Sequence, residues 1–254
     1  MPHAPRTEHG NVVPLRVAAV SVFNPQALAC RDCGVRQFAL LGALDEAALI
    51  HIHDRIDSIT VQPGEALFRA GEMGHDLITL RSGVVRLERS SEQGERRILR
   101  LAGRADLLGM ETVLGQSYAA DAIACTVVQA CRLPRAMVEE LSAQHRGLTH
   151  DLMKRWQRAL DDADEWLTEL STGTARHRML RLWLKLSEYS DAQQDGGLVW
   201  LPSRHDMGAM LNMTFETASR LISALRKEGI VELVDPRHAR LNMDALLAAL
   251  KEEC

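Results

Sequence analysis

One stretch toward the carboxyl end of the chain, residues 201–229, restricts the possible folds more than any other. Its sequence, LPSRHDMGAMLNMTFETASRLISALRKEG, predicts two short helices joined by a tight turn. Ser203 and Thr214 are suitable N-caps, because a hydroxyl oxygen accepts hydrogen bonds from the backbone amides of a first helical turn. Gly229 is placed to end the second helix. The apolar residues of that helix recur at steps of three and four: Ala218, Leu221, Ile222 and Leu225.

Polar side chains remain on the opposite face of the second predicted helix. Glu216, Ser219 and Arg220 lie near its amino terminus, in line with Thr214 and Thr217. A helix-turn-helix presents residues at these positions to base edges in the major groove of DNA. The same pattern occurs on solvent-exposed helices that bind nothing, so the polar face alone leaves both interpretations open.

Short apolar runs flank the helix pair and favour DNA binding. They cover residues 198–201, 231–234 and 239–241. Runs of this length, bounded by turn residues, predict short strands, so the whole unit is predicted to be a winged helix-turn-helix. Arg237, His238 and Arg240 lie on the predicted hairpin, where they can contact DNA phosphates.

The region between about residue 45 and residue 134 consists of short apolar runs broken by glycines. VVRLERS and RRILRL alternate apolar and polar residues, and Gln93-Gly94 stands between them, which predicts a β-hairpin. Repeated strands at this spacing favour a sandwich, jelly roll or barrel.

Residues 135–171 differ in composition from the preceding region, since they include no proline and one glycine. Apolar residues at steps of three and four predict a single long helix: Leu148, Leu152, Trp156, Ala159, Ala163, Trp166 and Leu170. Such a stripe suits pairing with the same helix of a second copy in a parallel homodimer, and it also suits packing against the β region. We expect the homodimer.

The sequence therefore predicts an α+β chain of four segments. These are a disordered tail (1–24), a cysteine-bearing segment with a β-roll sensor domain (25–134), a dimerisation helix (135–172) and a winged helix-turn-helix domain (173–254). The hydrophobic content of 46% is that of a soluble protein, and no run reaches the ~20 apolar residues of a membrane span. With no apolar signal-peptide core, the chain is expected in the cytoplasm, without a membrane partner.

Three motifs now identify a resemblance. PGEALFRAGE and LRSGVVRL in the β region, and FETASRL in the second helix, resemble the cAMP receptor protein/FNR family of transcription regulators over roughly residues 29–246. The Glu-x-x-Ser-Arg pattern matches the FNR branch of that family. The resemblance implies that Glu216, Ser219 and Arg220 bind a TTGAT-like half-site of a promoter palindrome. It also implies RNA polymerase as a partner.

The resemblance bears on the signal that the sensor domain detects. Family members that bind cyclic nucleotides carry an Arg-Ser pair that holds the cyclic phosphate. The matching segment here, residues 114–122, reads LGQSYAADA and contains no arginine. A cyclic phosphate therefore lacks its bidentate partner, and we expect no cyclic nucleotide.

Cysteines offer a second kind of sensor. In FNR-type oxygen sensors, four cysteines hold a [4Fe–4S] cluster, and Cys30, Cys33 and Cys131 match three of those positions. Ala39 stands where the third amino-terminal cysteine is expected, and alanine cannot be a ligand. Cys125 is a possible substitute fourth ligand, although its simplest role is that of a small buried hydrophobe.

Other sensors remain open. They are a thiol–disulfide switch, a sensor that has been lost, and a less favoured haem, for which the candidate ligands are His51, His53, His75 and His145. The sequence does not predict an enzyme, because CRDC lacks the βαβ context of thiol oxidoreductases and no nucleophile–base arrangement is evident.

Overall fold

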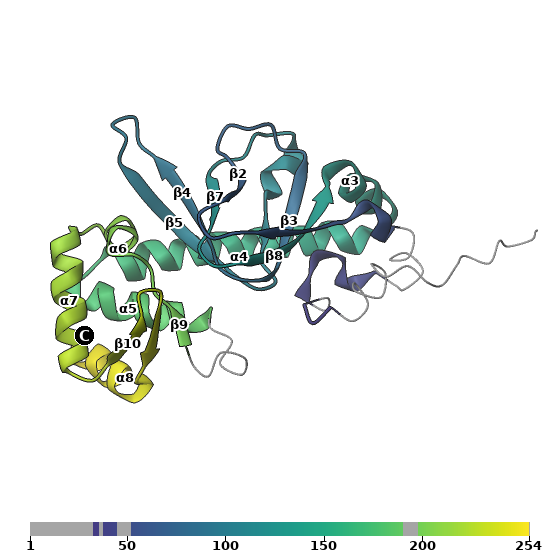
Figure 1. Cartoon of the computed structure of the whole chain (residues 1–254). Helices are drawn as coiled ribbons and strands as arrows, with labels where there is room; N and C mark the ends of the chain where they lie inside the picture. The colour runs from purple at the N-terminus through teal and green to yellow at the C-terminus, as the bar shows by residue number, and fades with distance from the viewer. Residues whose placement is uncertain (1–32, 36–37, 45–51, 190–197, 254) are drawn as a thin grey trace, which may run out of the picture.

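A computed structural model describes residues 33–35, 38–44, 52–189 and 198–253. The predicted tail, Cys30, His51 and Cys254 lie outside these residues. Figure 1 shows a β-domain, one long helix running beside it, and a mainly helical carboxyl-terminal domain at the far end of that helix. This arrangement confirms the predicted α+β fold.

The β-domain consists of two four-stranded antiparallel sheets. Their orders are β1-β8-β3-β6 and β2-β7-β4-β5. The strands are β1 (Asp57–Val61), β2 (Ala66–Phe68), β3 (Asp76–Ser82), β4 (Val85–Ser90), β5 (Arg96–Ala102), β6 (Leu107–Leu108), β7 (Asp121–Ala124) and β8 (Val128–Pro134). Apolar side chains from both sheets, among them Leu80, Val85 and Val128, fill the space between them. The predicted hairpin is confirmed as β4–β5, which pairs in antiparallel register.

Short 3-10 helices accompany the strands. They are η2 (Leu40–Ala43), η3 (His53–Arg55) and η4 (Met110–Leu114). Met137, Val138 and Leu141 of the following helix pack with Leu40 and other buried residues in one apolar cluster.

Two helices replace the single helix predicted for residues 135–172. They are α3 (Arg135–Gln144) and α4 (Arg146–Ser171), and His145 between them has an extended backbone, with φ −122° and ψ 94°. The break allows α3 to contact β8 and η4 while α4 runs along the domain. No proline marks this position, so apolar periodicity could not reveal it. None of the helices in the described part of the chain has the length and apolarity to cross a membrane.

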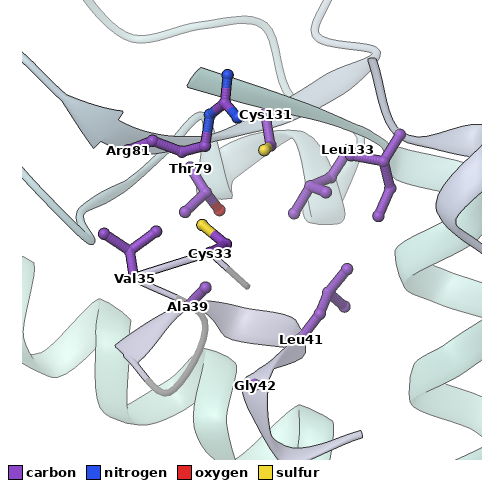
Figure 2. Close-up of a pocket in the computed structure, with 10 residues that line it drawn as sticks. Cys33, Val35, Ala39, Leu41, Gly42, Thr79, Arg81, Cys131 and Leu133 are labelled. Carbon is purple, nitrogen blue, oxygen red and sulfur yellow. The ribbon is translucent and has the colours of Figure 1, made fainter. Parts of the chain in front are cut away.

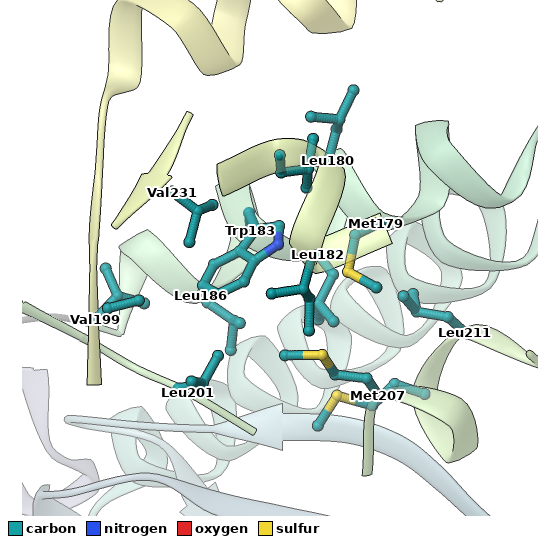
Figure 3. Packing of buried hydrophobic residues seen from close by; sticks show 14 of the residues in the cluster. Met179, Leu180, Leu182, Trp183, Leu186, Val199, Leu201, Met207, Leu211 and Val231 are labelled. Carbon is teal, nitrogen blue, oxygen red and sulfur yellow. The ribbon is translucent and has the colours of Figure 1, made fainter. Parts of the chain in front are cut away.

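The carboxyl-terminal domain combines helices with a small sheet of order β10-β11-β9. Its elements are α5 (Ala175–Glu188), β9 (Leu198–Trp200), α6 (Arg204–Leu211), α7 (Phe215–Lys227), β10 (Val231–Asp235), β11 (His238–Leu241) and α8 (Met243–Glu252). Trp183 is fully buried at the centre of its core (Figure 3). The same apolar cluster includes Ile98 and Leu101 of β5 and Trp166 of α4, so it joins the domain to the hairpin and the long helix.

Candidate nucleic-acid interface and sensor cavity

Helices α6 and α7 form the helix pair that the sequence predicted. The Ser203 hydroxyl accepts a hydrogen bond from the Asp206 amide, and the Thr214 hydroxyl accepts one from the Thr217 amide at 3.2 Å. Asn212 lies in the turn with a left-handed backbone, φ 52°. Both predicted caps and the turn are therefore present.

Gly208 makes the turn compact, a role that pattern analysis missed. A Cβ atom at this position would lie 2.7 Å from the carbonyl oxygen of Met213. That is closer than real Cβ contacts, so the turn would have to open around any larger residue. The sequence shows a glycine at position 208, but the need for it arises from the close approach of the Met213 carbonyl, which the sequence does not reveal.

The predicted reading residues share one surface of α7. Glu216 and Arg220 are exposed, and Ser219 and Thr217 are half-buried. Hydrogen bonds from its own backbone amide and from the Thr214 hydroxyl hold the pKa of Glu216 below its ordinary value. Glu216 is thus held as a carboxylate acceptor at the amino terminus of the helix, where negative charge is favoured.

An exposed aromatic ring adjoins this surface and was not predicted as part of it. Phe215, the first residue of α7, is 45% exposed, and its ring centroid lies 5.0 Å from that of His205. A large apolar side chain exposed to solvent beside the predicted reading residues is available for an apolar contact with a ligand. The sequence could have indicated this exposed ring, because a phenylalanine stands at the first position of the predicted helix.

The wing consists of β10 and β11, and it carries the three predicted phosphate contacts. His238 Nδ1 lies 2.8 Å from an oxygen of Asp235, and Arg240 Nη1 lies 3.2 Å from an oxygen of Glu232. No ion pair engages the Arg237 side chain among the residues described. Arg237, at the turn, is therefore the most available of the three.

A chain of ion pairs links the β4–β5 hairpin to α6. Glu88 lies 2.6 Å from Nε of Arg86 and 3.1 Å from Nη1 of Arg96. Arg96 then reaches across to Asp206, with Nη2 2.6 Å from the carboxylate. The Ser203 hydroxyl donates to the other oxygen of Asp206 at 2.8 Å. The sensor domain and the first helix of the pair are thus held together by charge-assisted hydrogen bonds.

Two predicted cysteine ligands line one small cavity of about 60 Å³ (Figure 2). Cys131 lies on β8 as the sheet neighbour of Thr79 on β3, and Cys33 faces the same cavity from the amino-terminal segment. Ala39 is also in its lining, so the position that should carry the third cysteine does adjoin the other two. The structure therefore brings Cys33 and Cys131 together, as the resemblance implied.

Buried polar atoms in this lining lack partners. Oγ1 of Thr79 and Nε of Arg81 are buried and make no hydrogen bond. Orphaned donors beside two thiols suit an anionic, sulfur-rich group such as an iron–sulfur cluster, so the donors fit in kind. They fall short in number, because two thiols are present here and no group of three metal-binding side chains occurs among the described residues.

Cys125 does not join this lining, which corrects its assignment as a substitute ligand. It lies 6% exposed in the apolar cluster of the carboxyl-terminal domain, with Sγ 3.9 Å from the carbonyl oxygen of Ile123. Burial raises the pKa of its thiol to about 12. Cys125 follows β7 and Cys131 lies on β8, and Cys125 belongs to a different apolar cluster from the one that Cys131 packs against.

The apolar stripe predicted to form the dimer seam is largely covered by the chain itself. Four of its members are buried, Leu148 and Leu152 in the cluster that includes α3, and Trp166 and Leu170 in the carboxyl-terminal core. Ala159 and Ala163 are half-buried, and Trp156 is 42% exposed. The exposed large apolar residues of α4 form a neighbouring stripe: Met153, Trp156, Leu160 and Leu167. Four of the seven predicted seam residues are thus covered within one chain, while Trp156 and Ala163 lie on both stripes, because the two adjacent stripes share the same periodicity.

Two family profiles match the chain. A cyclic nucleotide-binding domain profile matches residues 58–145, and a Crp-like helix-turn-helix domain profile matches residues 177–249. The fumarate and nitrate reduction regulatory protein of Vibrio cholerae is 26% identical over 216 residues, covering 82% of this chain and 84% of the relative. The anaerobic regulatory protein of Pasteurella multocida is 27% identical over 214 residues, covering 82% and 77%.

Solved structures share the fold. FixK2 from Bradyrhizobium japonicum superposes with a TM-score of 0.68 at 24% identity, covering 76% of this chain and 96% of that one. A CRP/FNR-family transcriptional regulator from Thermus thermophilus superposes with a TM-score of 0.64 at 24% identity, covering 78% and 100%.

Proposed function

The chain belongs to the CRP/FNR family of transcription regulators, and we propose that it binds a TTGAT-like promoter palindrome as a homodimer. The observation that carries this proposal is the polar surface of Glu216, Ser219 and Arg220, on a helix whose other face is buried. A guanidinium fork matches the O6 and N7 acceptors of guanine, and a carboxylate accepts from the N4 amine of cytosine. In a dimer, half-sites about one helical turn apart would meet the two α7 helices.

Residues around this surface extend the proposed contact. Phe215 suits an apolar contact with a thymine methyl group, and Arg237 on the wing suits a phosphate. Thr214 and Thr217 act first as partners in the helix cap, with their hydroxyl oxygens 3.2 Å apart. Contact with RNA polymerase stays a prediction.

Arg220→Ala is expected to weaken binding to a cognate palindrome by about 1–3 kcal/mol and to flatten discrimination at one base pair. Loss of a bidentate base contact has both effects, whereas loss of a phosphate contact weakens all sequences alike. Competition binding with single-base operator variants measures both quantities. Arg226→Ala, in the last turn of the same helix, is the matched control. An unchanged base preference in Arg220→Ala would remove this side chain from the reading surface.

For dimerisation we propose the exposed stripe of α4 in place of the buried one. Met153, Trp156, Leu160 and Leu167, with Ala163 between the last two, follow steps of three and four along one side of the helix. This heptad spacing is that of a parallel helix pair. A second copy of α4 would cover apolar area that is otherwise left in water.

For the sensor we propose an iron–sulfur cluster held by Cys30, Cys33 and Cys131. When bound, such a cluster supplies reversible electron transfer and reactivity toward oxygen. The thiols bind as thiolates, Thr79 and Arg81 provide donors beside them, and the apolar lining limits access of water. Ala39 leaves one iron without a cysteine from the family's set, so this cluster is expected to be more labile than a four-cysteine one.

Cys131→Ser is expected to abolish bound iron while leaving the fold intact, since Cys131 is half-buried and serine is close in size. Iron and sulfide analysis with absorption spectra, on protein purified without oxygen, measures this. Cys125→Ser is the control and should retain iron. A colourless wild-type protein whose operator affinity depends on a thiol reductant would instead support the thiol switch. Iron that persists in Cys131→Ser would exclude Cys131 as a ligand.

The proposed sensor does not involve a cyclic nucleotide. Tyr118, in the segment where the family's phosphate-binding arginine is absent, is 8% exposed and stacks on Phe68 with ring centroids 4.0 Å apart. Both rings belong to the apolar interior of the β-domain. The two rings fill this part of the interior, which supports the expectation that no cyclic nucleotide binds. Titration with a cyclic nucleotide tests that expectation.

A further inference from the structure

A second and larger cavity of about 500 Å³ lies where the β-domain, α4 and the end of α5 meet. We call it the arginine cavity, because four guanidinium groups line it: Arg100, Arg104, Arg155 and Arg158. Its lining shares no residue with that of the cysteine cavity. Its volume falls in the range of pockets that hold small organic ligands.

Arg155, in the lining of the arginine cavity, is held in place by backbone contacts. Its two terminal nitrogens donate to the carbonyl oxygens of Ala105, at 3.3 Å, and Phe38. The Nε atom is buried and has no hydrogen-bond partner. Burial, together with the like charge of Arg158, lowers the pKa of Arg155. One guanidinium of the lining is therefore fixed in place by backbone contacts.

Two further arginines of this cavity have unused donors. Arg100 and Arg158 make no hydrogen bond or ion pair within the described part of the chain. Arg104 also lines the cavity, and it donates to the carbonyl oxygen of Gly34 at 2.8 Å. Arg100 and Arg158 thus place two positive charges at the cavity without a carboxylate in direct contact, and an anion between them would relieve their repulsion.

The acidic residues of the lining form no ion pair with Arg100 or Arg158 among the described residues, although Asp106 lies near enough to Arg100 to attract it electrostatically. Asp106 accepts a hydrogen bond from the Gly103 amide at 2.7 Å, and burial raises the pKa of this carboxyl. Glu188 lines the cavity, and its carboxylate lies 2.9 Å from Nζ of Lys185, a residue that is not part of the lining. Asp162 also lines the cavity, and it forms no ion pair among the described residues.

We propose that the arginine cavity binds a small oxyanion with at least two negative charges, carried by phosphate or carboxylate groups. Arg100 and Arg158 offer bidentate donors to such a group. The ligand would touch β5 and α4 at once, beside the last residue of α5. If the proposed function holds, the bound anion would therefore link the sensor domain to the DNA-binding domain.

Titration calorimetry on the full-length protein, without DNA, tests the proposal with pyrophosphate and with citrate at matched ionic strength. Binding of pyrophosphate alone identifies a phosphate ligand, and binding of citrate alone identifies a carboxylate ligand. In Arg100→Gln and in Arg158→Gln, Kd should rise at least tenfold. Arg89→Gln, an exposed arginine of β4 outside the lining, is the matched control.

Two outcomes would overturn the proposal. One is the absence of heat from either anion in wild-type protein, and the other is an equal loss in Arg89→Gln, which would show general charge attraction. Circular dichroism confirms that each variant is folded. Operator binding is measured separately on the same proteins, so failure of the anion site and failure of the proposed DNA recognition are distinguishable.

Discussion

Replacement of Asp206 by asparagine should lower the free energy of unfolding by about 2–4 kcal/mol, since it breaks a largely buried ion pair at one end. The Asp206 side chain is 8% exposed and contacts Arg96 at 2.6 Å. Arg96 keeps Glu88 as a second partner, which places the expected loss below that of a fully buried pair. Denaturant titration at neutral pH measures it. Glu232→Gln, which removes an exposed ion pair with Arg240, should change stability by less than about 0.5 kcal/mol.

The carboxylate of Asp206 should also make the stability of the protein depend on pH. Burial works against ionisation of Asp206, but hydrogen bonds from Ser203 and Arg96 outweigh it and hold its pKa below the ordinary value. A carboxyl whose folded pKa is depressed stabilises the protein above its unfolded pKa, near 3.9, and loses that contribution as pH falls through the folded value. The stability difference between wild type and Asp206→Asn should therefore shrink below about pH 4. A constant difference down to pH 2 would contradict the assigned ionic contact.

Leu160→Asp should dissociate the homodimer and weaken operator binding at least 100-fold, roughly 3 kcal/mol or more. Leu160 is 53% exposed in the single chain, so the substitution leaves the fold unharmed. In the proposed helix pair, it places two carboxylates at an apolar seam, where each loses solvent and repels the other. Sedimentation equilibrium and gel shift assays measure the two effects.

Two comparison variants sharpen this test. Thr168→Asp adds the same charge to an exposed position of α4 outside the stripe, and it should remain dimeric. Leu152→Asp alters the stripe favoured by sequence periodicity, but Leu152 is 8% exposed, so this variant should lose stability instead. A dimer that survives Leu160→Asp would show that copies of the chain associate through another surface.

Local signals allowed most of the fold to be predicted. Ser203 and Thr214 accept the expected hydrogen bonds, and β4 and β5 pair around the expected turn. These features depend on neighbours within a few residues, which a sequence displays directly. The exposed polar face of α7 could be predicted for the same reason, because its polar and apolar residues follow the period of one helix.

Features that depend on distant contacts could not be predicted. Periodicity located an apolar stripe on α4, but it could not show that Leu148 and Trp166 are covered by other parts of the chain. The convergence of Cys33 and Cys131 could be predicted only through a family resemblance, because no local spacing links residues so far apart in the sequence. The arginine cavity gave no signal at all, because Arg100 and Arg158 belong to a strand and a helix with unrelated patterns.

The apolar cluster that joins Ile98, Trp166 and Trp183 gives α4 the mechanical role of a lever. The carboxyl-terminal domain shares its core with the hairpin and the long helix, so it is packed against them and not merely joined by a flexible linker. Helix α4 has 26 residues and is therefore about 39 Å long. A tilt of about 5° at one end displaces the other by roughly 3 Å, close to the ~3.4 Å rise of one base pair. In the proposed dimer, a tilt of this size would shift each α7 helix by about one base pair relative to its half-site.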